Sequence, residues 1–549
     1  MNKPIKILAS AFLVLALVAP APSQFSVFPD SSYFKEQWGR APYDVEIDSV
    51  ANLEDYVVDG KLQLSLKNFI ELVMVNHPNI NLQKLNVYQQ ENAISRALSP
   101  FDPTATASFN TTRSQNPSAD VLQGAAVRSQ LNQVGRIGYN QTFDTGTAFQ
   151  TNFTSIRRSD NSSFASFNPS LSEQLQFQIT QPLMRGRGRG VQRLGVMIAE
   201  SRLYQTKAQV RQQIIQILFQ AENAYWNAVN NRERLGVQQN NLELARAFLE
   251  RSRLELELGA ISPLDIFQPE QQFATAQVQV TQAQYQLQQA EDAVRRQVSA
   301  DLHPDVRNLP VVLTESAAPP AYTPTFDPEE TVLRALLYRP EMDQRQRALE
   351  ADDFAIKQAN NQLKPNLSLT GTYSATGLGG NFFERSLVGG TSSLATPGGL
   401  GDALDQLFGF NFPTYTVGLS LQLPIRNRRA AAGLSDAVIA KRRDLLQMRN
   451  QEQQIRLDVL QAIAGVEQSK AGVQQATVAR DFAQKRLDAE QKKYDLGVST
   501  AFVVLDAQDD LVSSAANLLA QSIAYRRALL TLYQATGELL DKRGVVLDY

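Results

Sequence analysis

Apolar residues recur at intervals of three, four and seven over two long stretches of the chain, and this spacing predicts two very long helices. The stretches run from about residue 190 to 258 and from about 427 to 496, and neither contains a proline. Each holds roughly 70 residues, which would extend for about 100 Å at 1.5 Å per helical residue. The remaining positions are rich in Gln, Ala, Arg and Glu, a composition that favours coiled-coil-like packing against neighbouring helices.

Both long stretches end in a similar turn, and the similarity indicates an internal repeat. Gly259 and Ser262 in the first turn recur 238 residues later as Gly497 and Thr500. The glycines are expected to take the left-handed conformation that ends a helix. Ser262 and Thr500 are expected to cap the returning helix through their side-chain oxygens, with Pro263 at its first helical position. The sequence therefore predicts two helical hairpins.

Shorter helices are needed to cover the rest of each long helix. The predicted breaks lie at His77–Pro78 and Arg339–Pro340, and a proline-rich stretch separates the two repeats. The further helices are predicted over residues 66–98, 262–299, 329–363 and 500–540.

Between the short and long helices the period changes from helical to two, which predicts strands. The alternating runs are of the length that a tilted strand needs to cross a bilayer. A glycine-rich segment, residues 376–413, separates the second pair of strands and is expected to be a surface loop. The four predicted strands cover residues 103–112, 171–182, 366–373 and 414–423.

Two more alternating runs, residues 137–143 and 147–153, flank the turn signal Asp144-Thr145-Gly146. They either form an extra hairpin or lengthen the strand pair outside the membrane. Four membrane strands cannot close a barrel alone, because their edges would leave backbone groups unpaired in lipid. Three copies would supply twelve strands, so the strand count predicts a homotrimer.

The first 24 residues have the pattern of a secretory signal peptide, with Lys3 and Lys6 before the apolar run Ile7–Val18. No later run of 18 apolar residues suggests a membrane helix, so any crossing is expected to use strands. The formal net charge of −2 shows no basic excess, and no nucleic-acid partner is expected. The predicted organisation is a signal peptide (1–24), an N-terminal extension (25–60), a first repeat (61–300), a linker (301–328), a second repeat (329–542) and a C-terminal tail (543–549).

The chain has no cysteine and two histidines, so neither a metal site nor a cofactor is predicted. No nucleophile–base motif suggests an enzyme, and no catalytic residue is assigned. Basic residues cluster where a strand meets a long helix, at Arg185 and Arg187 and again at Arg426 and Arg428. These junctions lie either close to lipid headgroups of the inner leaflet or in purely structural turns.

Several segments together resemble the TolC-like outer-membrane efflux protein family. Residues 66–72 with Asn76-His77-Pro78 resemble its opening helix, and residues 97–103 resemble the entry to its first strand. Residues 180–186, echoed by 423–426, resemble its strand-to-helix junction. The resemblance covers roughly residues 60–542.

The resemblance implies an α+β membrane protein, a trimer with a long α-helical periplasmic barrel and a shared transmembrane β-barrel. It implies an exit channel in the outer membrane of a Gram-negative-type cell, in contact with outer-membrane lipid. A periplasmic adaptor and an inner-membrane transporter of the RND or ABC type are the implied partners, in efflux or type I secretion. From a different class, a periplasmic coiled-coil scaffold or adaptor without a pore is the alternative.

The resemblance also assigns roles near the turns. Asp506 falls at a position where the family has an acidic, cation-selecting entrance, although the usual acidic companion is Val503 here. Asp265 and Tyr494 match positions of the family's closing contacts, whereas the expected arginine is Ser499. A capping or surface role for Asp506 is the alternative, because acidic residues are common in first helical turns.

Overall fold

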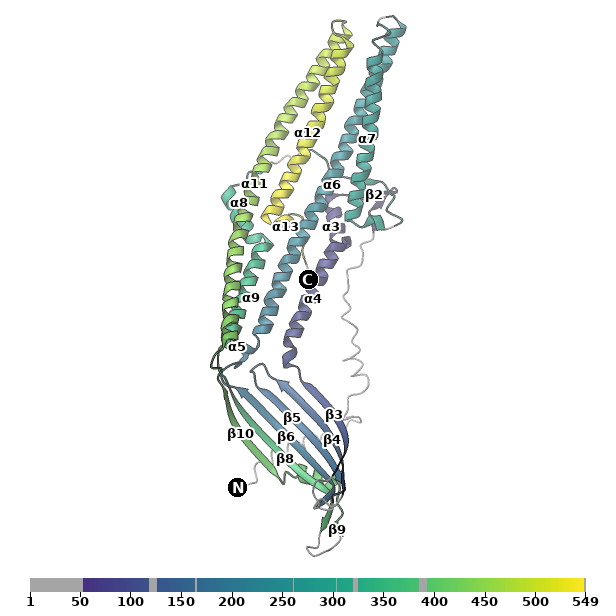
Figure 1. Ribbon diagram of the computed structural model, residues 1–549. Coiled ribbons are helices and arrows are strands. Elements are labelled where there is room, and N and C mark those ends of the chain that lie inside the picture. The colour runs from purple at the N-terminus through teal and green to yellow at the C-terminus, as the bar shows by residue number, and fades with distance from the viewer. Residues whose placement is uncertain are drawn as a thin grey trace, which may run out of the picture. The chain divides into compact units, whose positions relative to one another are not determined.

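The computed structural model describes residues 53–117, 126–162, 165–259, 261–302, 304–318, 324–384 and 393–547. The predicted signal peptide and most of the predicted N-terminal extension lie outside these ranges. All the described residues belong to one compact unit, residues 50–549. Within it, two helical repeats are joined to one large β-sheet (Figure 1).

The first repeat contains the predicted helices with small shifts at their ends. The long helix α6 ends at Glu257, and the returning helix begins at Phe267 rather than at Ser262. The prediction that Pro263 is the first helical residue is therefore wrong, because residues 263–266 form a separate turn. The helices are α3 (Leu66–Asn76), α4 (Pro78–Leu98), α5 (Arg189–Gln192), α6 (Leu194–Glu257) and α7 (Phe267–Gln297).

The second repeat follows the same order. Its long helix has 68 residues, against 64 in the first repeat, so the predicted lengths are confirmed in both. The helices are α8 (Pro328–Tyr338), α9 (Pro340–Gln362), α11 (Arg428–Asp495), α12 (Ala501–Thr536) and α13 (Leu539–Lys542).

Each long helix packs along its returning helix at one end and along a shorter helix at the other. In Figure 1, α6 lies beside α7, and α11 lies beside α12. The α9 helix contacts both α6 and α11, and α12 also contacts α6, so the two repeats share their packing. The largest apolar cluster surrounds the middle of α6 and includes Phe69, Tyr225 and Trp226. A second cluster joins α8, α11 and α12 around Ile455 and Tyr525.

The breaks in the short helices are confirmed at His77–Pro78 and Arg339–Pro340. Both His77 and Arg339 have extended backbones, with ψ of 117° and 125°. A residue before proline is disfavoured in the helical region, and proline is well suited to start the next helix. The chain therefore bends at these two points without losing helix on either side.

The predicted linker contributes a strand to a small sheet. Its β7 (Val311–Leu313) pairs in parallel with β2 (Lys61–Leu64), which pairs with β1 (Val57–Val58). Leu62 and Leu64 are fully buried, and the Tyr225 hydroxyl donates to the Leu64 carbonyl oxygen at 3.1 Å. The stretch between the repeats is thus anchored to α6 and to the start of the described chain. Short 3₁₀ turns cover Leu53–Tyr56, Ser99–Phe101 and Ala300–Leu302.

The large sheet has seven strands in the described chain, six of them in a continuous antiparallel order, β10-β8-β6-β5-β4-β3. The sheet order thus adds two strands to the four that the sequence assigned to the membrane. The two runs left open between an extra hairpin and a lengthened pair form a hairpin inside the sheet. With six strands per copy, two copies could also supply enough strands to close a barrel, so closure alone no longer selects the trimer. The strands are β3 (Thr104–Pro117), β4 (Val127–Thr142), β5 (Ala148–Asp160), β6 (Phe167–Pro182), β8 (Asn366–Glu384) and β10 (Pro413–Gln422).

The sequence predicts a surface loop over the glycine-rich segment 376–413, but the segment also contains strand and helix. Strand β8 continues to Glu384, a short β9 (Ser393–Thr396) pairs with it, and α10 (Leu400–Phe408) packs on the sheet. A Cβ atom at Gly377 would overlap the carbonyl oxygen of Ala403. The glycines thus permit close approach of a helix to the strand, a role that a composition-based loop assignment overlooks.

Candidate functional site

The turn that ends α11 is a complete Schellman motif. Gly497 has φ of +75°, and its N–H donates to the Tyr494 carbonyl oxygen at 2.8 Å. The Val498 N–H donates to the Lys493 carbonyl oxygen at 2.9 Å. Gly259 has φ of +70° and makes the first of these bonds, to Leu256 at 3.0 Å. Both glycines therefore end their helices as predicted.

The residues after the glycines depart from the prediction. Thr500 is the N-cap residue of α12 by position, but its side chain makes no capping hydrogen bond. Ser262 accepts from the Leu264 N–H at 3.3 Å, and its own N–H donates to Asp265 Oδ2 at 3.2 Å. These bonds hold the turn 263–266 instead of the first turn of α7. Asp265 therefore caps its own turn in this structure.

Tyr494 takes part in a polar cluster that joins the ends of the two long helices. Its hydroxyl donates to Glu255 Oε2 at 2.7 Å, and Arg251 Nη1 donates to Asp495 Oδ1 at 2.7 Å. Arg251 Nε also donates to Glu255 Oε1 at 2.9 Å, and its guanidinium lies 4.8 Å from the centre of the Tyr494 ring. We call Arg251, Glu255, Tyr494 and Asp495 the α6–α11 lock.

The electrostatics of the lock are consistent with these bonds. Burial and the hydrogen bond to Glu255 raise the pKa of Tyr494 to about 12, so its hydroxyl remains a donor at neutral pH. The hydrogen bond from Arg251 lowers the pKa of Asp495, which favours its charged form. An apolar cluster with Phe248, Leu487 and Leu505 lies against Tyr494.

Asp506 lies on α12 and is paired with a cation of its own hairpin. Arg486 Nη2 is 2.6 Å from Asp506 Oδ2, and the same guanidinium also pairs with Asp510. Asp509 accepts from Gln272 on α7 at 2.5 Å, which connects the two hairpins. Burial, with smaller contributions from the charges of Asp506 and Asp510, raises the pKa of Asp509. Asp506 and Asp510 thus share one arginine, and Asp509 accepts from a glutamine instead.

The sequence interpretation missed Arg251, Glu255 and Arg486. Arg486 precedes Gly497 by 11 residues and Asp506 follows it by nine. In an antiparallel hairpin, residues at similar distances from the turn face each other, so this pairing could have been predicted from the repeat. The α6–α11 pairs join the two repeats, and no spacing along the chain indicates them.

The basic junctions lie at the ends of β6 and β10. Arg187, Arg426 and Arg428 are exposed, whereas Arg185 is half-buried. The neighbouring glycines have a structural cause, because Gly186 and Gly188 have φ of +76° and +89°. The Gly186 N–H also donates to Asn361 Oδ1 at 2.8 Å. The turn is thus built by glycines, and the arginines extend from it.

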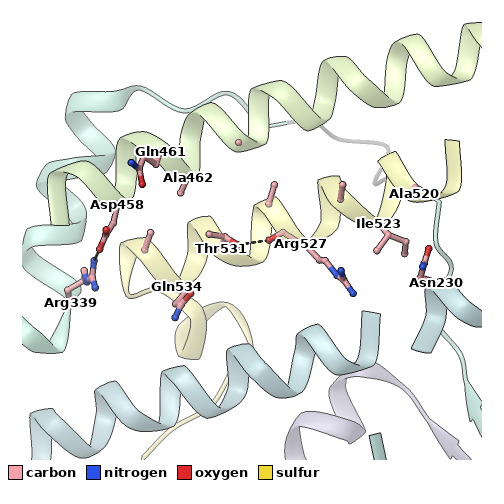
Figure 2. A pocket seen from close by; sticks show the side chains of 14 residues that line it. Asn230, Arg339, Asp458, Gln461, Ala462, Ala520, Ile523, Arg527, Thr531 and Gln534 are labelled. Carbon is pink, nitrogen blue, oxygen red and sulfur yellow. Dashed lines mark hydrogen bonds and ion pairs between the residues drawn. The ribbon is translucent and has the colours of Figure 1, made fainter. Parts of the chain in front are cut away.

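A groove of about 730 Å³ with a mixed polar and apolar lining lies between α11, α12 and α6 (Figure 2). At one end Arg339 Nη1 donates to Asp458 Oδ2 at 2.9 Å, and Nη2 donates to Glu341 at 2.7 Å. At the other end Arg527 reaches the side-chain oxygen of Asn227 at 3.3 Å. Both arginines of the lining thus have polar partners, and none of the lining residues is a nucleophile next to a base.

Within the described ranges, no helix is both long and apolar enough to cross a bilayer. In the same part of the chain, no three His, Cys, Asp or Glu side chains are grouped as metal ligands.

Comparisons with known proteins give consistent results. Residues 332–538 match the family model for the outer membrane efflux protein. The chain is 23% identical over 496 residues to the outer membrane efflux protein BepC of Brucella suis biovar 1 (strain 1330), covering 90% of each.

Solved structures share the fold at low sequence identity. A CusC structure, studied for its folding and transmembrane channel formation, superposes with a TM-score of 0.60 at 15% identity, over 95% of this chain and 97% of that one. The open state of the MtrE outer membrane channel of Neisseria gonorrhoeae gives a TM-score of 0.58 at 18% identity, over 86% and 89%. At this identity the likeness concerns the fold.

Proposed function

Because this chain is similar to outer membrane efflux proteins in sequence and fold, we propose that three copies form an exit channel through the outer membrane of a Gram-negative-type cell. The helical hairpins would extend the channel into the periplasm. They would dock a periplasmic adaptor and an inner-membrane transporter of the RND or ABC type. The trimer rests on the resemblance, since the strand count does not select it.

One observation carries the proposal: the sheet has an apolar face and two edges without a partner strand in the described chain. Strands β3 and β10 pair on one side only, and both are exposed along almost their whole length. On β10, Val417 and Leu419 are 80% and 67% exposed. Such edges would aggregate in water, whereas lipid and a neighbouring copy would satisfy both the side chains and the backbone.

The opposite face of the sheet is suited to a water-filled lumen. Register pairs on this face join Thr, Ser, Asn and Gln side chains, for example Thr372 with Gln178 and Thr414 with Ser374. On the other face, Tyr415 pairs with Tyr373, at 5.1 Å between ring centres. This alternation is typical of strands with lipid on one side and water on the other.

The turns of both hairpins expose apolar side chains that a docking partner would cover. Leu258 and Leu264 are each 75% exposed, and Leu496 and Val498 are 79% and 73% exposed. Clustered exposed apolar side chains indicate an interaction surface. They support the proposal that an adaptor or pump binds at these turns.

A cation-selecting entrance at Asp506 remains part of the proposal in a modified form. Each Arg486 would offset part of the charge of Asp506 and Asp510, since all three side chains are about half exposed. The net negative charge at this height of the hairpin would come from Asp509 and from Asp506 and Asp510, which Arg486 neutralises only in part. Gating by Tyr494 would act through the α6–α11 lock, and Asp265 would act by holding its own turn.

Single-channel conductance of the purified protein in a planar bilayer tests the function. Discrete cation-selective steps are expected, with weaker selectivity in Asp506→Ala and stronger selectivity in Arg486→Gln. Equal selectivity in all three proteins would remove Asp506 from the entrance and leave the channel. A protein without conductance and without a detergent-resistant trimer would instead be a scaffold or adaptor without a pore.

A further inference from the structure

The β4–β5 hairpin occupies the middle of the sheet in the structure. It lies between β3 and β6, with continuous register on both sides, from Thr104–Asn140 to Pro117–Val127 and from Ala148–Thr180 to Arg158–Ser170. Strands β4 and β5 have 16 and 13 residues, which exceeds the 9–11 residues of a typical membrane strand. The hairpin is therefore long enough to cross the bilayer with the other strands.

The two faces of the sheet continue through most of the hairpin, with Val134–Ile156 on the polar face and Gln133–Arg157 on the apolar face as exceptions. Ile137 pairs with Phe153 on the apolar face, and Tyr139 packs against Phe149 at 6.3 Å between ring centres. On the polar face, Asn140 pairs with Gln150. A one-residue slip would exchange the faces, so this agreement indicates that the hairpin fits its place in the wall.

The hairpin also brings charge to the polar face. Arg128, Arg136, Arg158 and Asp160 all lie on that face, because their register partners do. Arg128 and Asp160 pair with each other at 3.9 Å. Arg136 and Arg158 are exposed, and neither forms an ion pair with a carboxylate of the described chain. Opposite-face Arg157, next to Arg158, has Gln133 as its partner at 3.0 Å.

We propose that the β4–β5 hairpin is part of the channel wall, so that each copy contributes six strands and three copies close a barrel of eighteen. This inference rests on the proposed channel. Barrel diameter grows roughly linearly with strand number, so the lumen would be about 1.5 times as wide as one closed without the hairpins. Arg136 and Arg158 would line it and favour anions, as arginine rings do in anion pores. The exit is thus suited to bulky solutes, and its arginines would weaken the cation preference that the entrance sets.

Cysteine pairs test the position of the hairpin in the assembled protein, since the natural chain has no cysteine. Directly opposite residues lie about 4.5–5.5 Å apart between Cα atoms, within reach of a disulfide. Thr112→Cys with Asn132→Cys reports β3 beside β4, and Asn152→Cys with Gln176→Cys reports β5 beside β6. Both pairs are expected to cross-link in outer-membrane vesicles. Cross-linking of Thr112→Cys to Gln174→Cys, Gln176→Cys or Gln178→Cys instead would place β3 beside β6 and overturn the inference.

Deleting residues 127–160 tests whether the hairpin sets the width of the lumen. The deletion removes one strand in each direction, so β3 and β6 would remain antiparallel and their polar faces would still agree. Blocking by polyethylene glycols of increasing size, added from the sheet side, would measure the lumen in planar bilayers. The deletion is expected to narrow it by about a third. An unchanged size limit would mean that the hairpin does not set the width.

Arg158→Gln combined with Arg136→Gln tests the charge, with Arg157→Gln as the matched control on the opposite face. The double variant is expected to shift the reversal potential toward cations, and the control is not. Equal behaviour of both would contradict a lumen position for Arg158. The failures remain distinguishable: absence of any conductance and of a detergent-resistant trimer counts against the channel itself. The cysteine pairs decide the hairpin's position even if the deletion does not fold.

Discussion

The two repeats share one helical plan and differ where the strands turn back. In both, a broken short helix leads into two strands, a long helix, a glycine turn and a returning helix. Between its outer strands the first repeat inserts the β4–β5 hairpin, whereas the second inserts β9 and the short helix α10. Helix lengths differ by only four residues between α6 and α11.

The difference shows which part of the repeat is constrained. A long helix has packing partners along almost its whole length, so an insertion would displace the apolar positions from their contacts. The far ends of the strands have no such partner. An insertion of two strands there preserves direction and face, and the helices remain unchanged. The two repeats therefore have the same helices but different strands. The strands are the part that would set the shape of the channel exit.

The helix breaks offer the largest test of this comparison. Arg339 holds its break with Glu341 and Asp458, and the three side chains are 13%, 12% and 32% exposed. Arg339→Ala would leave two largely buried carboxylates without a cation, at a cost of about 2–3 kcal/mol, below the range for fully buried pairs. His77→Ala removes the cap of the Asn79 N–H and the hydrogen bond to Gln297, and should cost about 1 kcal/mol.

Thermal unfolding followed by circular dichroism in detergent would compare the two variants. The Arg334→Ala variant serves as a control, because Arg334 is 43% exposed and its pairs lie at the surface. If Arg339→Ala is no less stable than His77→Ala, the ion-pair network does not hold the second break.

The segments inserted in the two repeats differ in how tightly they pack, and a glycine-to-alanine substitution in each repeat tests this difference. At Gly377 a methyl group would overlap the α10 backbone, so Gly377→Ala is expected to cost about 1–3 kcal/mol. At Gly135, on β4, the nearest atom to such a methyl group would be the Ser155 carbonyl oxygen at 4.0 Å. Gly135→Ala should therefore be neutral or slightly stabilising. Unfolding temperatures of the two variants check this, and a similar loss in both would remove the distinction.

The sequence predicts the helices well, because long apolar periods and prolines act locally. The breaks at His77 and Arg339 and the ends at Gly259 and Gly497 follow from backbone preferences alone. Positions 137–143 and 147–153 alternate as clearly as the other strands. Their place in the sheet depended on pairing with β3 and β6, which lie far away in the sequence.

The sequence predicted single residues of the candidate site but not the partners that these residues bind. Asp506 and Tyr494 were found through the resemblance, but Arg251 and Glu255 belong to the other repeat, 239 or more residues from the groups they bind. The capping role assigned to Thr500 failed because its side chain makes no capping bond in this turn. Side-chain rotamers of this kind are not specified by residue type.

The α6–α11 lock joins the two repeats, and Tyr494→Phe would weaken it. The substitution removes one hydrogen bond to a charged carboxylate in a partly exposed site, which should cost about 1 kcal/mol. Hydrogen exchange at the ends of α6 and α11 should become faster, and open-channel events in a bilayer should become more frequent. Tyr285→Phe on α7, where the ring is 65% exposed, is the matched control. Unchanged exchange in Tyr494→Phe would exclude the hydroxyl from the lock.

The smallest expected effect concerns pH at the first helix break, where the second repeat has no titratable cap. Burial lowers the pKa of His77, with a smaller contribution from Arg296, and the hydrogen bond to Gln297 opposes this. The folded chain therefore binds this proton less readily than the unfolded chain, whose pKa is about 6.5. The stability from neutral His77 is fully present above that value and is lost as the pH falls through 6.5 to the lower folded pKa. Protonated Nδ1 also cannot accept from the Asn79 N–H.

His77→Asn tests this, because asparagine keeps a capping oxygen that does not titrate. Between pH 7.5 and 5.5, the unfolding temperature of this variant should depend less on pH than that of the natural chain. The difference should be equivalent to about 0.5 kcal/mol. Identical pH dependence in both proteins would show that groups other than His77 set the acid sensitivity. The breaks at His77 and Arg339 would then differ only in how much they contribute to stability.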